Sequence, residues 1–185
     1  MKKHLDIVKA LPEIELIKDT KLREQTIKVW ERLFAESKWE NIMDLPCSTH
    51  KTDYPHITHN RSVVKMALQV ADILEEVHGV LVNRDYLLAA ALLQDASKLV
   101  EYEPVSGGGC QLSDIGKKFV HSYYGGHVAL DEGVPNDVVQ TIVTHSPDAP
   151  VFPQTLITKI LFYVDQIDMA AIGGDRWKKA ISIYR

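Results

Sequence analysis

Seven consecutive apolar residues, Leu87 to Leu93, run directly into Gln94 and Asp95, and Lys98 follows one turn later. A run that is apolar on every side favours a helix buried on all its faces. The amide and the carboxylate at its end are costly to bury without partners. If the helix continues, Asp95 and Lys98 share a face, so they form either an ordinary surface ion pair or the edge of a buried site. The rest of the chain must therefore pack around this helix.

The overall charge and the cysteine content exclude several classes of function. The chain of 185 residues has a formal net charge of -4, which gives no general attraction for nucleic acid polymers or acidic membranes. No apolar run approaches the length of a membrane span, and no signal peptide is visible, so we expect no membrane partner and a cytoplasmic location. The two cysteines, Cys47 and Cys110, form no CxxC pair and indicate neither a disulfide framework nor a thiolate zinc site.

Most other segments show apolar residues at three- and four-residue spacings, which predicts further helices. The pattern gives an all-α bundle of about seven to nine helices, without a convincing strand signal. Residues 1–45 are expected to form a helical lead-in that packs on a core domain of residues 46–185. A helix is expected over residues 112–131, in which Gly125 and Gly126 indicate either a close helix–helix approach or a break. A short last helix is expected from Asp175.

Polar residues interrupt these apolar helices at regular intervals. They lie 35, 26, 24 and 20 residues apart, and they are His59, the pair Gln94–Asp95, His121, His145 and Asp165. Each interval is about one helix and its connection, which places one such residue on each of several helices. Bundles build metal sites from facing helices in this way, and imidazole and carboxylate suit Fe, Mn, Zn, Co or Ni. Each histidine alone is better explained by packing or exposure, but together they predict a site for one or two divalent ions.

The segments around these residues carry a family resemblance. They are Thr58-His59-Asn60-Arg61-Ser62-Val63, Leu92-Leu93-Gln94-Asp95-Ala96-Ser97-Lys98, His121-Ser122-Tyr123-Tyr124-Gly125-Gly126, Thr144-His145-Ser146 and Tyr163-Val164-Asp165-Gln166-Ile167-Asp168. Their order resembles the H…HD…H…H…D pattern of the HD-domain metal-dependent phosphohydrolases, whose core is an all-α bundle. The resemblance covers residues 55–170 and agrees at five of the six ligand positions. The departure is Gln94, which stands where the family has the histidine of its His-Asp pair.

The resemblance implies two metal ions bridged by Asp95. The first ion would be held by His59, Asp95, Asp165 and the amide oxygen of Gln94, and the second by Asp95, His121 and His145. A glutamine amide is a weaker donor than imidazole, so the first ion would bind less tightly or be a different metal. Alternatively, His56 or His127 compensates for the loss. His127 does not share a helical face with His121 and is more plausible as a substrate contact.

By the same resemblance, the chain is expected to hydrolyse a phosphate ester, most often a nucleotide or a related small molecule, with metal-activated water. Asp95 would bridge the ions or orient the nucleophile. Lys98 would neutralise the phosphate, or would simply pair with Asp95. Arg61 and His127 are candidate phosphate contacts, and Asp168 could support a metal ligand by a hydrogen bond from behind. Arg61 and His127 are more simply interpreted as surface residues, and Asp168 is equally explicable as part of a solvated helix face.

Two other functions stay open at this point. Dinuclear-iron oxygenases of the HD type also resemble this chain, and they would be recognised by oxygen consumption. The change at Gln94 could instead mark a degenerate, non-catalytic module that binds a nucleotide or a partner protein. We expect a phosphorylated small molecule as the partner, and a homodimer is left open.

Overall fold

The computed structural model describes residues 5–147, 149, 151 and 154–173. In this part of the chain the α-helices are α1 (Ile7–Ala10), α2 (Thr20–Glu36), α3 (His56–His78), α4 (Arg84–Leu93), α5 (Lys98–Glu101), α6 (His121–Asp131), α7 (Asn136–Thr144) and α8 (Leu156–Gly173). Two 3-10 helices, η1 (Pro12–Leu16) and η2 (Ile42–Asp44), complete the helical elements there. The prediction of an all-α bundle is confirmed. The helix expected from Asp175 lies outside the described residues.

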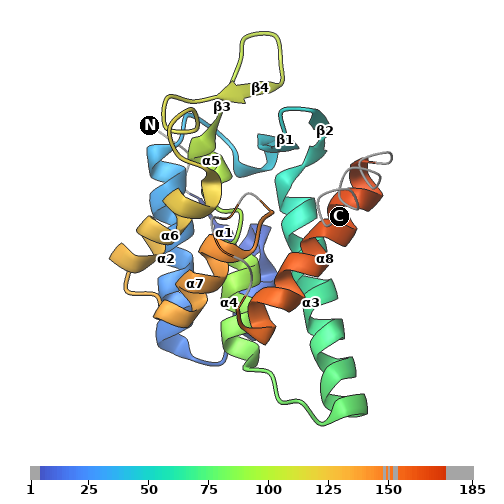
Figure 1. Cartoon of the computed structure of the whole chain (residues 1–185). Coiled ribbons are helices and arrows are strands. Elements are labelled where there is room, and N and C mark those ends of the chain that lie inside the picture. Colours follow the sequence, from blue (N-terminus) through green and yellow to red (C-terminus); the bar gives the residue numbers. More distant parts are fainter. Residues whose placement is uncertain (1–4, 148, 150, 152–153, 174–185) are drawn as a thin grey trace.

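Helix α4 is the centre of the bundle (Figure 1). All seven residues from Leu87 to Leu93 are buried, and α4 contacts α2, α3, α7, α8 and η1. Its first turn is capped by Asn83, whose side-chain oxygen accepts from the Tyr86 N–H at 3.1 Å. A helix contacted from all sides needs no polar face, which explains the unbroken apolar run. Among the described helices, none has the length and apolar character that a membrane crossing requires.

The N-terminal residues pack on this centre. Leu11 and Ile14 are fully buried in the same core cluster as the residues of α4. Trp30 of α2 is also fully buried, and its indole N–H donates to the Leu92 carbonyl at 3.1 Å. This hydrogen bond ties α2 to the carboxyl end of α4, where the polar residues of the sequence pattern begin.

Two small strand pairs depart from the sequence prediction. Strand β1 (Pro46–Ser48) pairs antiparallel with β2 (Lys51–Pro55), and β3 (Tyr102–Pro104) pairs antiparallel with β4 (Cys110–Leu112). Strands of three to five residues are too short to show an alternating pattern above the background. The β3–β4 connection contains Gly107, Gly108 and Gly109, with φ of 96°, 100° and 81°, a conformation that glycine adopts at little cost.

The helix expected over residues 112–131 begins only at His121, so the first part of that prediction is wrong. Ser113 accepts a hydrogen bond from the Gly116 N–H and donates to the Val100 carbonyl, which fixes a turn instead of capping a helix. The glycine pair does mark a close approach. A Cβ on Gly126 would lie 2.5 Å from the Val143 side chain of α7, and one on Gly125 would lie 3.1 Å from Ser97.

We expect Gly116→Ala to lower the free energy of unfolding by about 1–3 kcal/mol, because the added methyl group would overlap the backbone carbonyl of Glu101. Urea denaturation measures the change. Lys118→Ala, an exposed substitution two residues away, serves as control and should stay within about 0.5 kcal/mol of the wild type. Equal stability of the two variants would show that this turn has room for a side chain.

Candidate metal centre

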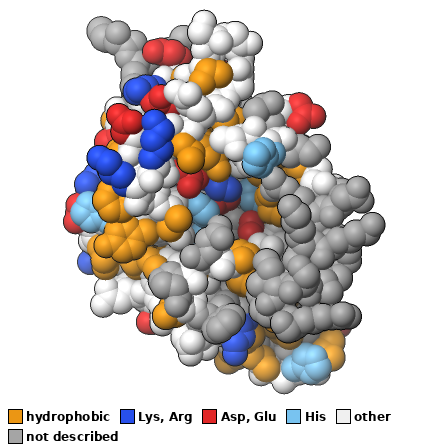
Figure 2. All heavy atoms as spheres, turned by 45° about the horizontal axis from the view of Figure 1, so that its top comes forward, with side chains coloured by type: hydrophobic (Ala, Val, Ile, Leu, Met, Phe, Trp, Pro, Cys, Tyr) orange, Lys and Arg blue, Asp and Glu red, His pale blue; other side chains and the backbone are white. Residues whose placement is uncertain are grey.

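Five residues of the sequence pattern converge at one end of the bundle, although they are far apart in the chain. His59 lies in the first turn of α3, Asp95 two residues after the end of α4, and His121 at the first position of α6. His145 follows the last residue of α7, and Asp165 lies within α8. On the face shown in Figure 2, acidic, basic and histidine side chains gather near the middle of the face, between hydrophobic side chains. The regular sequence spacing therefore corresponds to a common depth in the bundle.

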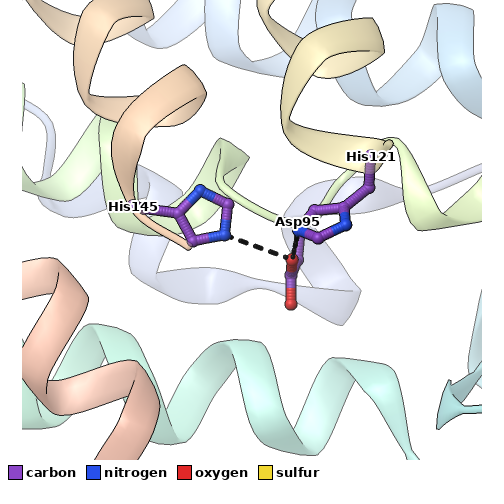
Figure 3. A group of neighbouring side chains, drawn as sticks. All are labelled: Asp95, His121 and His145. Atoms are coloured by element: carbon purple, nitrogen blue, oxygen red, sulfur yellow. Dashed lines mark ion pairs between the residues drawn. The ribbon is translucent and has the colours of Figure 1, made fainter. Parts of the chain in front are cut away.

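The carboxylate of Asp95 is the centre of this cluster, and it is 1% exposed. Its Oδ1 lies 3.1 Å from His121 Nε2 and 3.5 Å from His145 Nε2. In Figure 3 the two imidazoles approach the same carboxylate from the start of α6 and the end of α7. The other oxygen, Oδ2, lies 3.3 Å from His59 Nε2. The two oxygens therefore face two different sets of side chains.

These side chains form two groups that could each hold a metal ion. One group is Asp95, His121 and His145, and the other is His59, Asp95 and Asp165; within each, the donor atoms lie within 4.8 Å of one another. His59 Nε2 and Asp165 Oδ1 are 3.2 Å apart. Both groups combine imidazole with carboxylate and share Asp95. Such donor sets suit divalent first-row metals rather than thiolate-seeking ones.

The hydrogen bonding of the cluster fits a bound cation. Among the described residues, Asp95 Oδ1 and His59 Nε2 are buried without a hydrogen-bond partner, and Asp95 Oδ2 has no such partner besides its ion pair with Lys98. Buried polar atoms without partners are unfavourable and are rare in native proteins. A cation between these atoms would satisfy all of them.

Two of the imidazoles are held from behind with Nε2 directed into the site. His59 Nδ1 lies 2.7 Å from Asp168 Oδ2, and Asp168 is held in turn by the hydroxyl of Ser62. His145 Nδ1 lies 2.7 Å from the Ile142 carbonyl, which can only accept. The Nδ1 therefore carries the proton, and the lone pair of neutral His145 is on Nε2, as a metal ligand requires.

The corresponding partner of His121 is Glu101, a residue that the sequence analysis did not identify. Glu101 Oε1 lies 3.6 Å from His121 Nδ1, and Glu101 is 8% exposed. A carboxylate behind an imidazole orients the ring and increases its basicity. Its only sequence signal is its place one turn after Lys98, which is too weak to distinguish it from its acidic neighbours.

The electrostatics of the cluster are dominated by opposite charges at short range. Burial raises the pKa of Asp95, but the positive charge of Lys98 and the contacts with the neighbouring histidines outweigh it and hold that pKa well below its usual range. Burial lowers the pKa of His59, but contacts with Asp165 and Asp168 raise it well above its ordinary value. The pKa of His145 is also raised, since the contact with Asp95 outweighs burial. Without metal, the cluster therefore holds protons that an ion would displace.

Lys98 is part of the cluster and does not form a surface pair. Its Nζ lies 2.8 Å from Asp95 Oδ2 and 3.5 Å from the Cys47 carbonyl, and the residue is 8% exposed. Burial lowers the pKa of Lys98, but the charge of Asp95 outweighs it, so the pKa is raised and the ammonium stays charged. The site thus contains a fixed cation beside its central carboxylate.

Two further residues at the site are fully buried without hydrogen bonds. Gln94 is 0% exposed, and neither atom of its amide group has a partner in the described part of the chain. His56 is likewise 0% exposed, its two ring nitrogens lack partners there, and its Nε2 lies 4.0 Å from Asp95 Oδ2. Burial lowers the pKa of His56 to about 3, so this imidazole is neutral.

Arg61 and His127 have partners away from Asp95. The guanidinium of Arg61 donates to Glu13 at 2.9 Å. His127 has a half-exposed side chain that lies 3.7 Å from Asp131. Their predicted role as phosphate contacts stays a prediction.

One known protein shows clear similarity to the chain. It is the dihydroneopterin 2',3'-cyclic phosphate phosphodiesterase of Methanocaldococcus jannaschii, which is 31% identical over 163 residues. The match covers 83% of this chain and 65% of the relative, so the chain spans slightly less than two thirds of the relative's length. No family model and no solved structure matches the chain.

Proposed function

We propose that this chain is a metal-dependent hydrolase of phosphate esters and that its substrate is a small phosphodiester, in which the phosphate is cyclic. The single observation that carries the proposal is the position of Asp95, whose two oxygens face two groups of metal-ligating side chains. A carboxylate shared between two ions is the arrangement used by two-metal phosphoryl-transfer sites.

The similarity to a cyclic phosphate phosphodiesterase supports the reaction class and suggests the cyclic substrate. The resemblance of the sequence motifs to HD-domain phosphohydrolases points to the same chemistry. In that comparison, Asp95, His59, His121, His145 and Asp165 are the metal ligands, Gln94 is a weak oxygen ligand, and Lys98 contacts the substrate. Fe, Mn, Co, Ni and Zn all fit these donors.

A bound divalent ion supplies a Lewis acid and lowers the pKa of a coordinated water. The chain's own residues perform the other tasks. Asp168 and the Ile142 carbonyl hold the imidazoles of His59 and His145 in position. Lys98 offers a buried positive charge to a phosphate oxygen. The side chains of His121, Lys98 and Asp165 are 13%, 11% and 10% exposed, so the substrate would reach the centre between these three residues.

The proposal is tested on the chain stripped of metal and reloaded with each of these metals in turn. We expect hydrolysis of a 2′,3′-cyclic nucleotide and of bis(p-nitrophenyl) phosphate by at least one loaded form, and none after chelation. Elemental analysis should give two ions per chain, one for each group. We also expect no oxygen consumption during hydrolysis, which an oxygen electrode measures.

Two results would overturn the proposal. A chain that binds metal, consumes oxygen and releases no phosphate product would be an oxygenase. A folded chain that binds the cyclic nucleotide without turnover in every loaded form would be a binding module.

A further inference from the structure

The group formed by His59, Asp95 and Asp165 contains a single imidazole, whereas the group formed by Asp95, His121 and His145 contains two. Nothing in the first group replaces the nitrogen ligand that a histidine at position 94 would supply. Gln94 offers only a neutral amide oxygen, a weaker donor for these metals. The first ion would therefore be held poorly unless another residue contributes.

His56 is positioned to make that contribution. It lies one turn before His59 on α3, so both imidazoles leave the same face of the helix. Its Nε2 is 4.0 Å from Asp95 Oδ2, against 3.3 Å for His59 Nε2. Two donors that are each about 2.1 Å from one ion are at most about 4.2 Å apart. His56 is thus within range of Asp95, but it lies outside the group of donor atoms within 4.8 Å of one another that His59, Asp95 and Asp165 form, so its ring must turn toward an ion held there.

The surroundings of His56 do not explain it as a packing residue. It has no exposed surface, and neither ring nitrogen has a hydrogen-bond partner among the described residues. Its ring centroid is 6.1 Å from that of Trp30 and 6.4 Å from that of His59. A buried imidazole without partners costs more than an apolar side chain of its size, and a bound ion would supply the partner that such a group lacks.

The backbone holds His56 in this place. Its N–H donates to the Leu45 carbonyl at 2.9 Å, directly after the β1–β2 hairpin and at the first position of α3. The other candidate, His127, is half-exposed and pairs with Asp131. The structure therefore favours His56 over His127 as the residue that compensates for Gln94.

We propose that His56 is a ligand of the first metal ion and supplies the imidazole that position 94 lacks. This inference rests on the metal centre of the proposed function. Compared with a site that has a histidine at position 94, one nitrogen ligand would come from the start of α3 instead of the end of α4, and the other ligands would be the same. The first ion would then keep its full set of ligands, and Gln94 would not be a sign of degeneration.

The test measures the binding of Co²⁺ alone to the full chain. Calorimetry gives the affinity of each ion, and elemental analysis gives the number of ions per chain. We expect His56→Gln to weaken one of the two ions by at least about tenfold, since even residues behind a ligand change affinity about 10–100-fold. The ion held by Asp95, His121 and His145 should bind as in the wild type. His127→Gln is the matched control and should bind both ions normally. Thermal unfolding without metal checks that each variant folds.

A second variant tests the compensation directly. Adding Gln94→His to His56→Gln places an imidazole back at position 94, and we expect it to restore the lost ion. A crystal structure of the Co²⁺-loaded wild type should place His56 Nε2 at bonding distance from an ion, even if the variants fold poorly.

The outcomes separate this inference from the function on which it rests. If the wild type binds two ions and His56→Gln binds both with unchanged affinity, His56 is not a ligand, while the proposed function stands. If the loaded wild type shows His56 away from every ion, the same conclusion holds. If the wild type binds no ion, the metal centre itself is refuted, and this inference is refuted with it.

Discussion

Replacing Asp95 with alanine is expected to abolish the binding of both metal ions and all hydrolysis of phosphodiesters. Asp95 is the residue common to the two ligand groups, and its two oxygens lie within 3.5 Å of three imidazoles. No other carboxylate belongs to both groups. Its removal therefore leaves two imidazoles and no carboxylate in the group of His121 and His145, and it reduces the first group to His59 and Asp165.

The measurement is metal content per chain, together with the thermal shift that metal produces. A ligand that binds only the folded state raises the apparent stability, so the melting temperature of the wild type should rise with added Co²⁺. That of Asp95→Ala should not change. Asp131→Ala removes an exposed carboxylate that contacts Arg32 and serves as the matched control. A full complement of metal in Asp95→Ala would refute the assignment of the site.

The sequence pattern predicted the centre of the fold because one helix is apolar on all sides. Leu87 to Leu93 can be buried only if other helices surround α4, and the polar residues at its end then point to a site. The spacing of His59, Asp95, His121 and His145 reflects the length of a helix and its connection. The apolar run and the regular spacing of the polar residues are patterns along the chain, and such patterns can be recognised in a single sequence.

The features that escaped prediction depend on contacts across the fold. The orienting carboxylate of Glu101 meets His121 through a turn held by Ser113, and the sequence has no period that connects them. The late start of α6 has the same origin, since that turn competes with the helix. The two hairpins are fixed by pairing over a few residues, which local propensity does not reveal.

The substitution at position 94 shows how a structure changes the interpretation of a motif. In the sequence alone, glutamine in place of a ligand suggests a weakened or degenerate site. In the fold, His56 lies 4.0 Å from Asp95 Oδ2, and neither of its ring nitrogens has a hydrogen-bond partner among the described residues. Because residues one turn apart on a helix reach the same space, a ligand can move between elements without a change in the donor set.

Lys98→Ala is expected to lower kcat/KM for phosphodiester hydrolysis by about 10²–10³-fold while both ions stay bound, a loss comparable to that of one preorganised donor in an enzyme site. Lys98 is 8% exposed, and a charge in such surroundings interacts more strongly with a phosphate than one in water. Its contact with Asp95 is an ion pair and not a shared metal ligand, so the ligand groups remain intact. Steady-state kinetics and metal analysis on the same preparation measure the two effects.

The controls distinguish this role from a structural one. Lys98→Arg keeps the positive charge and should recover part of the lost rate, whereas Lys98→Met keeps only the apolar stem and should not. Lys38→Ala, at an exposed lysine that pairs with Glu103, should leave kcat/KM unchanged. If Lys98→Ala loses metal in proportion to its activity, then Lys98 acts by holding Asp95 in place, and its assignment as a phosphate contact is wrong. If it retains both metal and full activity, the substrate does not approach the centre from the side of Lys98.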